Sequence, residues 1–158
     1  MAIFDKDIIK IEGGLTNDRH DHGGLTKYGI SQNSYPNLDI ANLTVAQALD
    51  IYERDYWNRN KLSLIISQSI ANQIFLLIVN EGAEHAIKIV QAALVRRGMK
   101  IVIDGKIGIV TISTINKCNP FSLSESIRVA ECKHYLEIVD NEPSQEIFFR
   151  GWIRRALL

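Results

Sequence analysis

EGGLTNDRHDHGGLTKYGIS, residues 12–31, is the stretch of this chain on which its fold depends. Five of its twenty residues are glycine, although the whole chain has only ten, and Asp, Asn and Thr are frequent among the others. Such a composition favours turns and is incompatible with a helix in the core. The stretch therefore predicts a tight β-hairpin or loop, folded back over the residue that precedes it.

That residue is Glu12, and the segment before it has the periodicity of a helix. Three apolar residues lie on one helical face: Phe4, Ile8 and Ile11. We expect a helix over Ala2–Ile11 that ends at the glycine pair and holds Glu12 at its last turn. The negative end of the helix dipole and the apolar neighbours would both raise the pKa of the carboxyl group, as a general acid requires. A solvated glutamate at a helix end is the alternative interpretation.

The spacing of the polar residues in this stretch resembles that of a known enzyme family. Eight residues separate Glu12 from Asp21, and four separate Asp21 from Thr26. Phage-T4-type lysozymes have a similar Glu, Asp and Thr progression. Glu-Gly-Gly followed by Asp-x-Gly-Gly-x-Thr-x-x-Gly-Ile resembles more closely the N-acetylmuramidases of glycoside hydrolase family 108. That family includes phage endolysins and muramidases once called secretion activators.

Four further blocks extend the resemblance in the same order along nearly the whole chain. They are Tyr52…Tyr56-Trp57, Asn80-x-Gly82 with Gln91, Asp104-Gly105-x-x-Gly108-x-x-Thr111, and Phe149-x-Gly151-Trp152-x-x-Arg155. The chain departs from the family pattern at Leu15, where an aromatic residue is usual, and at His22, where proline is usual.

The resemblance implies a mainly α, lysozyme-like fold. We expect a helical bundle with a small β-hairpin or loop next to the catalytic helix. Residues 1–68 would form the catalytic half, and residues 69–158 a helical, peptidoglycan-binding half. We expect the two halves to pack as one compact unit that shares the helix Ser69–Asn80.

The resemblance also implies a reaction, which is hydrolysis of the β-1,4 bond between N-acetylmuramic acid and N-acetylglucosamine in peptidoglycan. Glu12 would protonate the leaving oxygen. Asp21 would stay ionised, and would either steer a water or stabilise positive charge at the anomeric carbon. Thr26 would position the water. Asp18 is a rival for the role of Asp21, and the sequence does not distinguish a retaining from an inverting outcome.

Five residues of the matching blocks are predicted to contact the glycan: Tyr28, Tyr56, Trp57, Asn80 and Gln91. Aromatic rings can stack on the apolar faces of sugars, but at helical spacing they also pack in cores. Asn80 can instead cap a helix, and Gln91 lies on or beside an apolar helical face, which is typical of a buried amide with a specific partner.

The remaining elements are predicted from periodicity, capping signals and breakers. Helices are expected over residues 44–57, 69–80, 83–97, 108–117 and 122–139, and from residue 144 to the end. Thr44-x-x-Gln47 and Ser122-x-x-Glu125 both match the capping box. A short helix is expected from Ser31, and a short extended piece before the turn Asp104-Gly105.

Composition limits the classes of partner. Lys plus Arg number 18 and Asp plus Glu also number 18, so the basic excess of a nucleic-acid-binding protein is absent. The two cysteines, Cys118 and Cys132, are too few for a disulfide framework and are expected to be free thiols, although a single bridge would be possible if their helices packed side by side. No cofactor is expected.

Two other chemistries are alternatives to that of a muramidase. His20, Asp21 and His22 resemble part of a zinc site, but a fourth ligand is not apparent, so we predict no metal. An amidase or peptidase would need zinc or a pair such as Cys118 and His134, and neither residue lies in a nucleophile turn. The main alternative is a non-catalytic peptidoglycan-binding protein of the same fold.

The N-terminal sequence MAIFDKDIIK has two aspartates and no hydrophobic region of a signal peptide. The longest apolar run, Ile74–Val79, is too short to span a bilayer, so stable membrane insertion is not expected. We expect synthesis in the cytoplasm and action on the cell wall, in the periplasm, after release by a holin or an export system.

Overall fold

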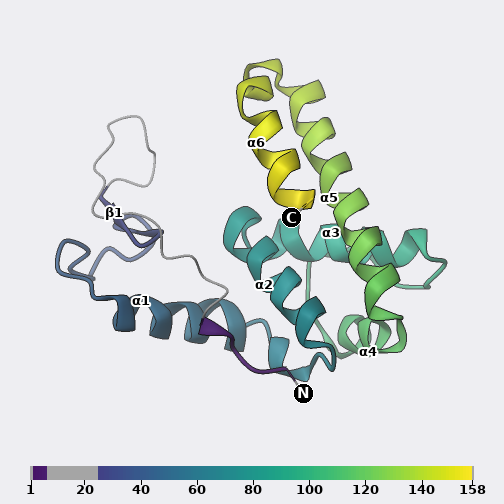
Figure 1. The fold of residues 1–158 in the computed structure, drawn as a ribbon, viewed down its shortest axis with the longest axis horizontal. Coiled ribbons are helices and arrows are strands. Elements are labelled where there is room, and N and C mark those ends of the chain that lie inside the picture. Colours follow the sequence, from purple (N-terminus) through teal and green to yellow (C-terminus); the bar gives the residue numbers. More distant parts are fainter. Residues whose placement is uncertain (1, 7–24, 158) are drawn as a thin grey trace. The chain divides into compact units, whose positions relative to one another are not determined.

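A computed structural model describes residues 2–6 and 25–157. The predicted site residues Glu12, Asp18 and Asp21 lie outside these residues. The chain forms two compact units: Phe4–Arg59, here called the N-terminal unit, and Asn60–Leu158 with Met1–Ile3, here called the C-terminal unit (Figure 1). The division at residue 68 and the packing of both halves as one unit stay predictions.

The described part of the N-terminal unit begins with a small antiparallel hairpin. Strand β1 (Thr26–Lys27) pairs with β2 (Ile30–Ser31), in a register that places Thr26 opposite Ser31. Tyr28 and Gly29 form the two-residue turn, with φ of 53° and 75°. Positive φ at both turn residues is the signature of a type I′ turn, whose twist matches that of paired strands. The sequence prediction of a hairpin is confirmed for this part of the stretch.

One long helical segment follows the hairpin. Helix α1 (Val45–Ile51) begins at the predicted capping box, in which Thr44 and Gln47 each bond the backbone N–H of the other. The segment then continues as the π-helix η2 (Tyr52–Asn58), where the N–H of Arg59 bonds the carbonyl of Arg54 at 3.2 Å, five residues back. The sequence predicted this helix but not its π geometry.

The C-terminal unit is a bundle of helices (Figure 1). Its elements are η3 (Leu62–Leu64), α2 (Gln68–Glu81), α3 (Ala83–Arg96), α4 (Ile109–Lys117), α5 (Pro120–Asn141), η4 (Pro143–Gln145) and α6 (Glu146–Leu157). Helix α3 packs against α2 and α5, and α6 packs on α5.

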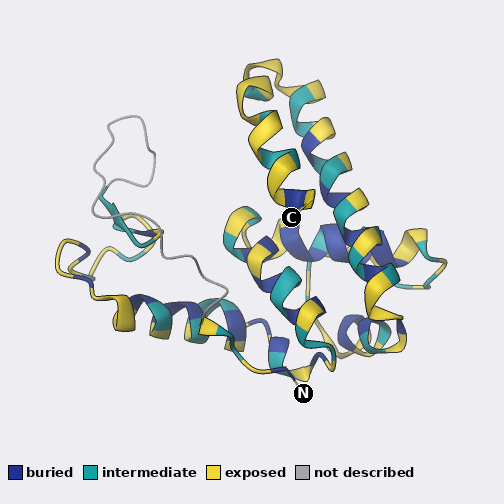
Figure 2. Cartoon of the chain, in the orientation of Figure 1, coloured by how far each residue is buried: buried dark blue, intermediate teal, exposed yellow. Residues whose placement is uncertain are grey.

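The core of this unit lies where α2, α3 and α5 meet (Figure 2). Each helix supplies side chains that are almost fully buried: Ile74, Phe75 and Ile78 from α2, Ile87, Val90 and Leu94 from α3, Leu123 and Ile127 from α5. Aromatic stacking attaches the last helix, because the ring of Trp152 lies 5.3 Å from that of Tyr135. Within the described residues, none of the helices combines the length and apolar content needed to cross a membrane.

The predicted start of the longest helix is wrong. Helix α5 begins at Pro120, and the side chain of Asn119 caps it by accepting the N–H of Ser122 at 3.1 Å. Proline suits the first position of a helix and asparagine is a strong N-cap, so Asn-Pro outcompetes the capping box predicted at Ser122. Ser122 instead accepts a hydrogen bond from Arg97, which ties the end of α3 to α5.

Three smaller expectations also fail. Residues 2–5 form no helix, so the predicted first helix does not start at Ala2, and its later residues lie outside the described part. Ser31 belongs to β2 and is followed by turns, not by a helix. Residues 101–103 form no strand, because the turn at Asp104 is held by a side chain and not by a strand partner.

A buried hydrogen-bond network links α2 to α5. The hydroxyl of Tyr135 lies 2.7 Å from Glu81 Oε1 and 2.9 Å from Glu131 Oε1. One hydroxyl proton cannot serve two carboxylates, so one of the carboxyl groups must supply a proton of its own. Glu131 is 6% exposed, and burial, with the nearby charge of Glu81, raises the pKa of its carboxyl above the ordinary value. Burial thus makes the protonated form of the Glu131 carboxyl group more favourable than it would be in water.

This network predicts a pH-dependent stability. Because the folded pKa of Glu131 is raised, the folded state holds a proton that the unfolded state releases, and the free energy of unfolding falls as pH rises through that raised pKa. We expect Glu131→Gln to remove this part of the decline, as measured by urea unfolding between about pH 4 and pH 8. The exposed Glu146→Gln is the control, and parallel curves for wild type and Glu131→Gln would refute the assignment.

Candidate active site

Thr26 is the one predicted catalytic residue inside the described part of the chain. It lies half-buried in β1, paired with Ser31 across the hairpin. The strand pairing fixes the backbone at the end of the stretch that holds Glu12 and Asp21. The catalytic roles predicted for Glu12, Asp21 and Thr26 stay predictions.

The hairpin turn next to Thr26 is anchored to η2. The hydroxyl of Tyr52 donates a hydrogen bond to the carbonyl of Tyr28 at 3.0 Å, and its ring lies 5.3 Å from the ring of Tyr56. Burial, followed by the neighbouring Tyr56, raises the pKa of Tyr52 to about 12, so this hydroxyl keeps its proton at neutral pH. Residues 26–28 are thereby held on the helical segment by a contact that persists across the physiological pH range.

Gly29 is the point of closest approach in this contact. A Cβ at this position would lie 2.5 Å from the hydroxyl oxygen of Tyr52, and φ of +75° is strained for any residue with a side chain. Glycine is therefore required both for the turn and for the anchor.

We expect Gly29→Ala to destabilise the N-terminal unit by about 1–3 kcal/mol and to displace the hairpin from Tyr52. Urea unfolding would measure the loss, and glycan turnover should fall with it. Gly151→Ala is the matched control, because a Cβ there meets nothing within 4 Å and an exposed helical glycine gains stability from alanine. If the Gly29 variant were as stable as wild type, the short distance between residue 29 and the Tyr52 hydroxyl would not restrict which residue can occupy this position.

A second polar contact in the N-terminal unit involves Tyr35 and η2. The hydroxyl of Tyr35 donates to Asp55 Oδ2 at 2.8 Å, and Arg54 donates to both carboxylate oxygens of Asp55 at 2.7 and 2.6 Å. The hydrogen bond from Arg54 holds the pKa of Asp55 below its usual range, and burial raises that of Tyr35. Asp55 is therefore ionised at neutral pH, which is unsuited to a general acid.

The two aromatic residues predicted to contact the glycan differ in exposure. Tyr56 is half-buried, and burial raises the pKa of its hydroxyl. Trp57 is 1% exposed, and its ring packs edge-on against Phe4 at 5.8 Å. Burial to this extent favours the alternative interpretation of Trp57 as a packing residue, whereas Tyr56 keeps surface for a ligand.

Asn80 and Gln91 belong to the C-terminal unit. Asn80 is exposed in the last turn of α2, which continues to Glu81, so it does not close the helix as predicted. Gln91 is 1% exposed, and its amide bonds the Asp104 carboxylate at 2.8 Å and the N–H groups of Asp104 and Gly105 at 3.0 and 2.9 Å. The structure favours the buried-amide interpretation of Gln91 over a substrate contact.

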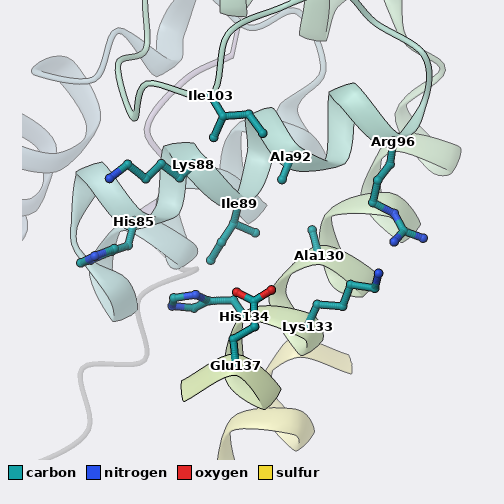
Figure 3. A pocket seen from close by; sticks show the side chains of 10 residues that line it. All are labelled: His85, Lys88, Ile89, Ala92, Arg96, Ile103, Ala130, Lys133, His134 and Glu137. Carbon is teal, nitrogen blue, oxygen red and sulfur yellow. The ribbon is translucent and has the colours of Figure 1, made fainter. Parts of the chain in front are cut away.

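The structure also reveals a groove that sequence reasoning missed. It has a volume of about 280 Å³ and lies between α3 and α5 (Figure 3). We call it the α3–α5 groove, and its lining residues are His85, Lys88, Ile89, Ala92, Arg96, Ile103, Ala130, Lys133, His134 and Glu137. On each helix these residues follow a three- and four-residue spacing, but the sequence does not reveal that the two faces meet.

Metal-ligand types do not converge in the described residues. Among residues 2–6 and 25–157, no three side chains of His, Cys, Asp or Glu are grouped closely enough to hold a metal ion. His20 and His22 lie outside this part. Cys118 and Cys132 are free thiols, as expected from the sequence.

Two family models match consecutive parts of the chain. Residues 6–82 match the model described as glycosyl hydrolase 108, and residues 85–157 match the model described as a predicted peptidoglycan domain. The first match includes Glu12, Asp21 and Thr26. The second contains the whole α3–α5 groove.

A search of solved structures finds similarity to a structure described as Brucella abortus SagA. The two chains are 21% identical, with a TM-score of 0.76, and the similarity covers 95% of this chain and 85% of the other. The mainly α, lysozyme-like fold class predicted from the sequence is confirmed. No curated protein matches the chain.

Proposed function

We propose that this chain, which belongs to the glycosyl hydrolase 108 family, is a peptidoglycan hydrolase that cleaves the β-1,4 bond between N-acetylmuramic acid and N-acetylglucosamine. The observation that carries the proposal is the family match over residues 6–82, which includes the Glu12, Asp21 and Thr26 spacing. The predicted peptidoglycan domain over residues 85–157 supports the same polymer as substrate.

In the proposed mechanism, two carboxyl groups divide the work. Glu12 in its protonated form donates a proton to the glycosidic oxygen as the bond breaks. Asp21 stays ionised and either activates the attacking water or stabilises the positive charge that develops at the anomeric carbon. Thr26 binds and orients the water, and the anchored hairpin supports this role because it restrains the backbone of residue 26.

Substrate access is part of the proposal. The polymer lies outside the cytoplasmic membrane, so a chain made in the cytoplasm needs a holin or an export system to reach it. The aromatic ring of Tyr28, which is half-buried beside Thr26 in the hairpin turn, is proposed to contact the glycan, together with Tyr56.

The test is digestion of purified Gram-negative peptidoglycan with the full chain, followed by mass spectrometry of the soluble fragments. Fragments with N-acetylmuramic acid at the reducing end are expected. Cuts within the peptide stem would overturn the glycosidase assignment in favour of an amidase or peptidase. Loss of activity in EDTA or after treatment with iodoacetamide would also favour an amidase or peptidase, because the proposed mechanism uses neither a metal nor a thiol.

A second candidate is a non-catalytic peptidoglycan-binding protein of the same fold. Leu15 and His22, which replace an aromatic residue and a proline of the family pattern, favour it. Retention on insoluble peptidoglycan without release of any fragment would support this candidate and refute the hydrolase.

A further inference from the structure

The two ends of the α3–α5 groove differ in charge. Lys88 is paired with Glu84 at 2.5 Å, and His134 Nε2 lies 3.8 Å from Glu81. Arg96 and Lys133 have no carboxylate within ion-pair distance in the described part of the chain. Figure 3 shows their side chains on the same side of the groove, one from α3 and one from α5. This end therefore has two cations without a carboxylate partner among the described residues, while the carboxylate of Glu137 also lines the groove.

The floor of the groove is aliphatic and built from small residues. Ala92 of α3 and Ala130 of α5 create the hollow, because neither side chain extends beyond Cβ, and Ile89 lies beside them. Of the described residues, no Phe, Tyr or Trp lines the groove. A sugar ring would find no stacking platform of that kind here, whereas a methyl side chain fits such a floor.

The surface continues beyond Arg96. A second hollow of about 430 Å³ is lined by Arg96, Arg97 and residues of α5, so Arg96 borders both hollows. Arg97 is held in place by Ser122, to which it donates at 3.0 and 2.9 Å. A ligand along this face therefore has room for several linked residues and meets the guanidinium group of Arg96, with the carboxylate of Glu125 farther along the second hollow.

We propose that the α3–α5 groove binds the carboxylate-bearing peptide stem of peptidoglycan, an inference that rests on the proposed function. In this polymer the negative charges lie mainly on the peptide stems, whose alanine side chains match the small aliphatic floor. Arg96 and Lys133 bind a stem carboxylate, and Ala92 and Ala130 accept a methyl group. The groove thus recognises the peptide, and the glycan is left to the catalytic residues.

The experiment measures binding of a fluorescent tetrapeptide stem, prepared from Gram-negative peptidoglycan, to the full chain by fluorescence anisotropy. The test variant is Arg96→Glu with Lys133→Glu. Its control is Arg150→Glu with Lys117→Glu, which makes the same change in net charge at exposed residues outside the groove. We expect the test variant to bind at least about tenfold more weakly than wild type, and the control to stay within about twofold.

Further measurements distinguish failure of this inference from failure of the proposed function. The same peptide with its carboxylates amidated should lose affinity for wild type to a similar extent. Equal affinity of test and control variants, or no saturable binding by wild type, would overturn the groove assignment. Cleavage of glycan strands stripped of their stems should be unchanged in the test variant, whereas absence of cleavage by wild type would refute the hydrolase alone. Thermal unfolding of each variant would verify that the fold is retained.

Discussion

Glu12→Gln is expected to reduce the rate of glycan cleavage by about 10²–10⁴-fold, because the amide cannot donate the proton that the leaving oxygen requires. The substitution preserves size and hydrogen bonding, so binding of peptidoglycan should be nearly unchanged. Release of soluble fragments with reducing-end N-acetylmuramic acid is the measurement. A variant that keeps more than about a tenth of the wild-type rate would remove Glu12 from the role of general acid.

Two aspartates provide the matched comparison for this prediction. Asp21→Asn is expected to cause a loss comparable to that of Glu12→Gln, because the second carboxylate must be ionised. Asp18→Asn in the same stretch should leave most of the activity. The reverse order would assign the second role to Asp18 and leave the role of Glu12 intact. Unchanged urea unfolding of all three variants would separate lost chemistry from lost folding.

Gln91→Leu is expected to destabilise the C-terminal unit by about 2–3 kcal/mol. The amide oxygen of Gln91 accepts two backbone N–H groups of the turn at Asp104 and Gly105, and its nitrogen donates to Asp104 and to the buried Thr111 at 2.8 and 3.3 Å. Leucine has a similar volume but satisfies none of these groups. Urea unfolding at neutral pH is the measurement.

Gln73→Leu is the control for this prediction, since it changes the same residue type in the neighbouring helix α2. Gln73 donates one long bond of 3.3 Å to the carbonyl of Ser124, and its buried side-chain oxygen has no hydrogen-bond partner within the described residues. Leucine at this position would remove one weak hydrogen bond and also one unpaired buried acceptor. We therefore expect the free energy of unfolding to change by less than about 1 kcal/mol. A larger loss at Gln73 than at Gln91 would contradict the structural role given to Gln91.

The helices were the most predictable part of the fold. Their apolar periodicity and breakers are local, so α2 to α4, α6 and the segment formed by α1 and η2 begin and end within a few residues of the predicted positions. Thr44 is recognisable as a cap from the sequence because its whole signal lies within four residues. At Ser122 the same signal was overridden by Asn119 and Pro120, which start the helix one turn earlier. The sequence therefore predicted elements better than their exact ends.

Features that depend on two distant segments were not predictable. The shared hydroxyl of Tyr135 needs α2 beside α5, and the α3–α5 groove needs two helix faces to meet. No local pattern marked the buried Glu131, which looks like an ordinary polar residue of an amphipathic helix. For the site, the sequence placed Thr26 and Tyr28 in a hairpin correctly, but it did not predict that Tyr52 anchors them.

The residue types in the hairpin turn also affect how this protein could be stabilised by engineering. Asn-Gly is the pair that most readily adopts a type I′ turn, whereas Tyr28 occupies a left-handed conformation at a cost of about 1–2 kcal/mol. An asparagine at this position would make a more heat-resistant hairpin, but the aromatic ring next to Thr26 would be lost. At position 28, the stability of the turn thus competes with the glycan contact proposed for Tyr28. Stabilising substitutions are therefore better placed in the helices than at this turn.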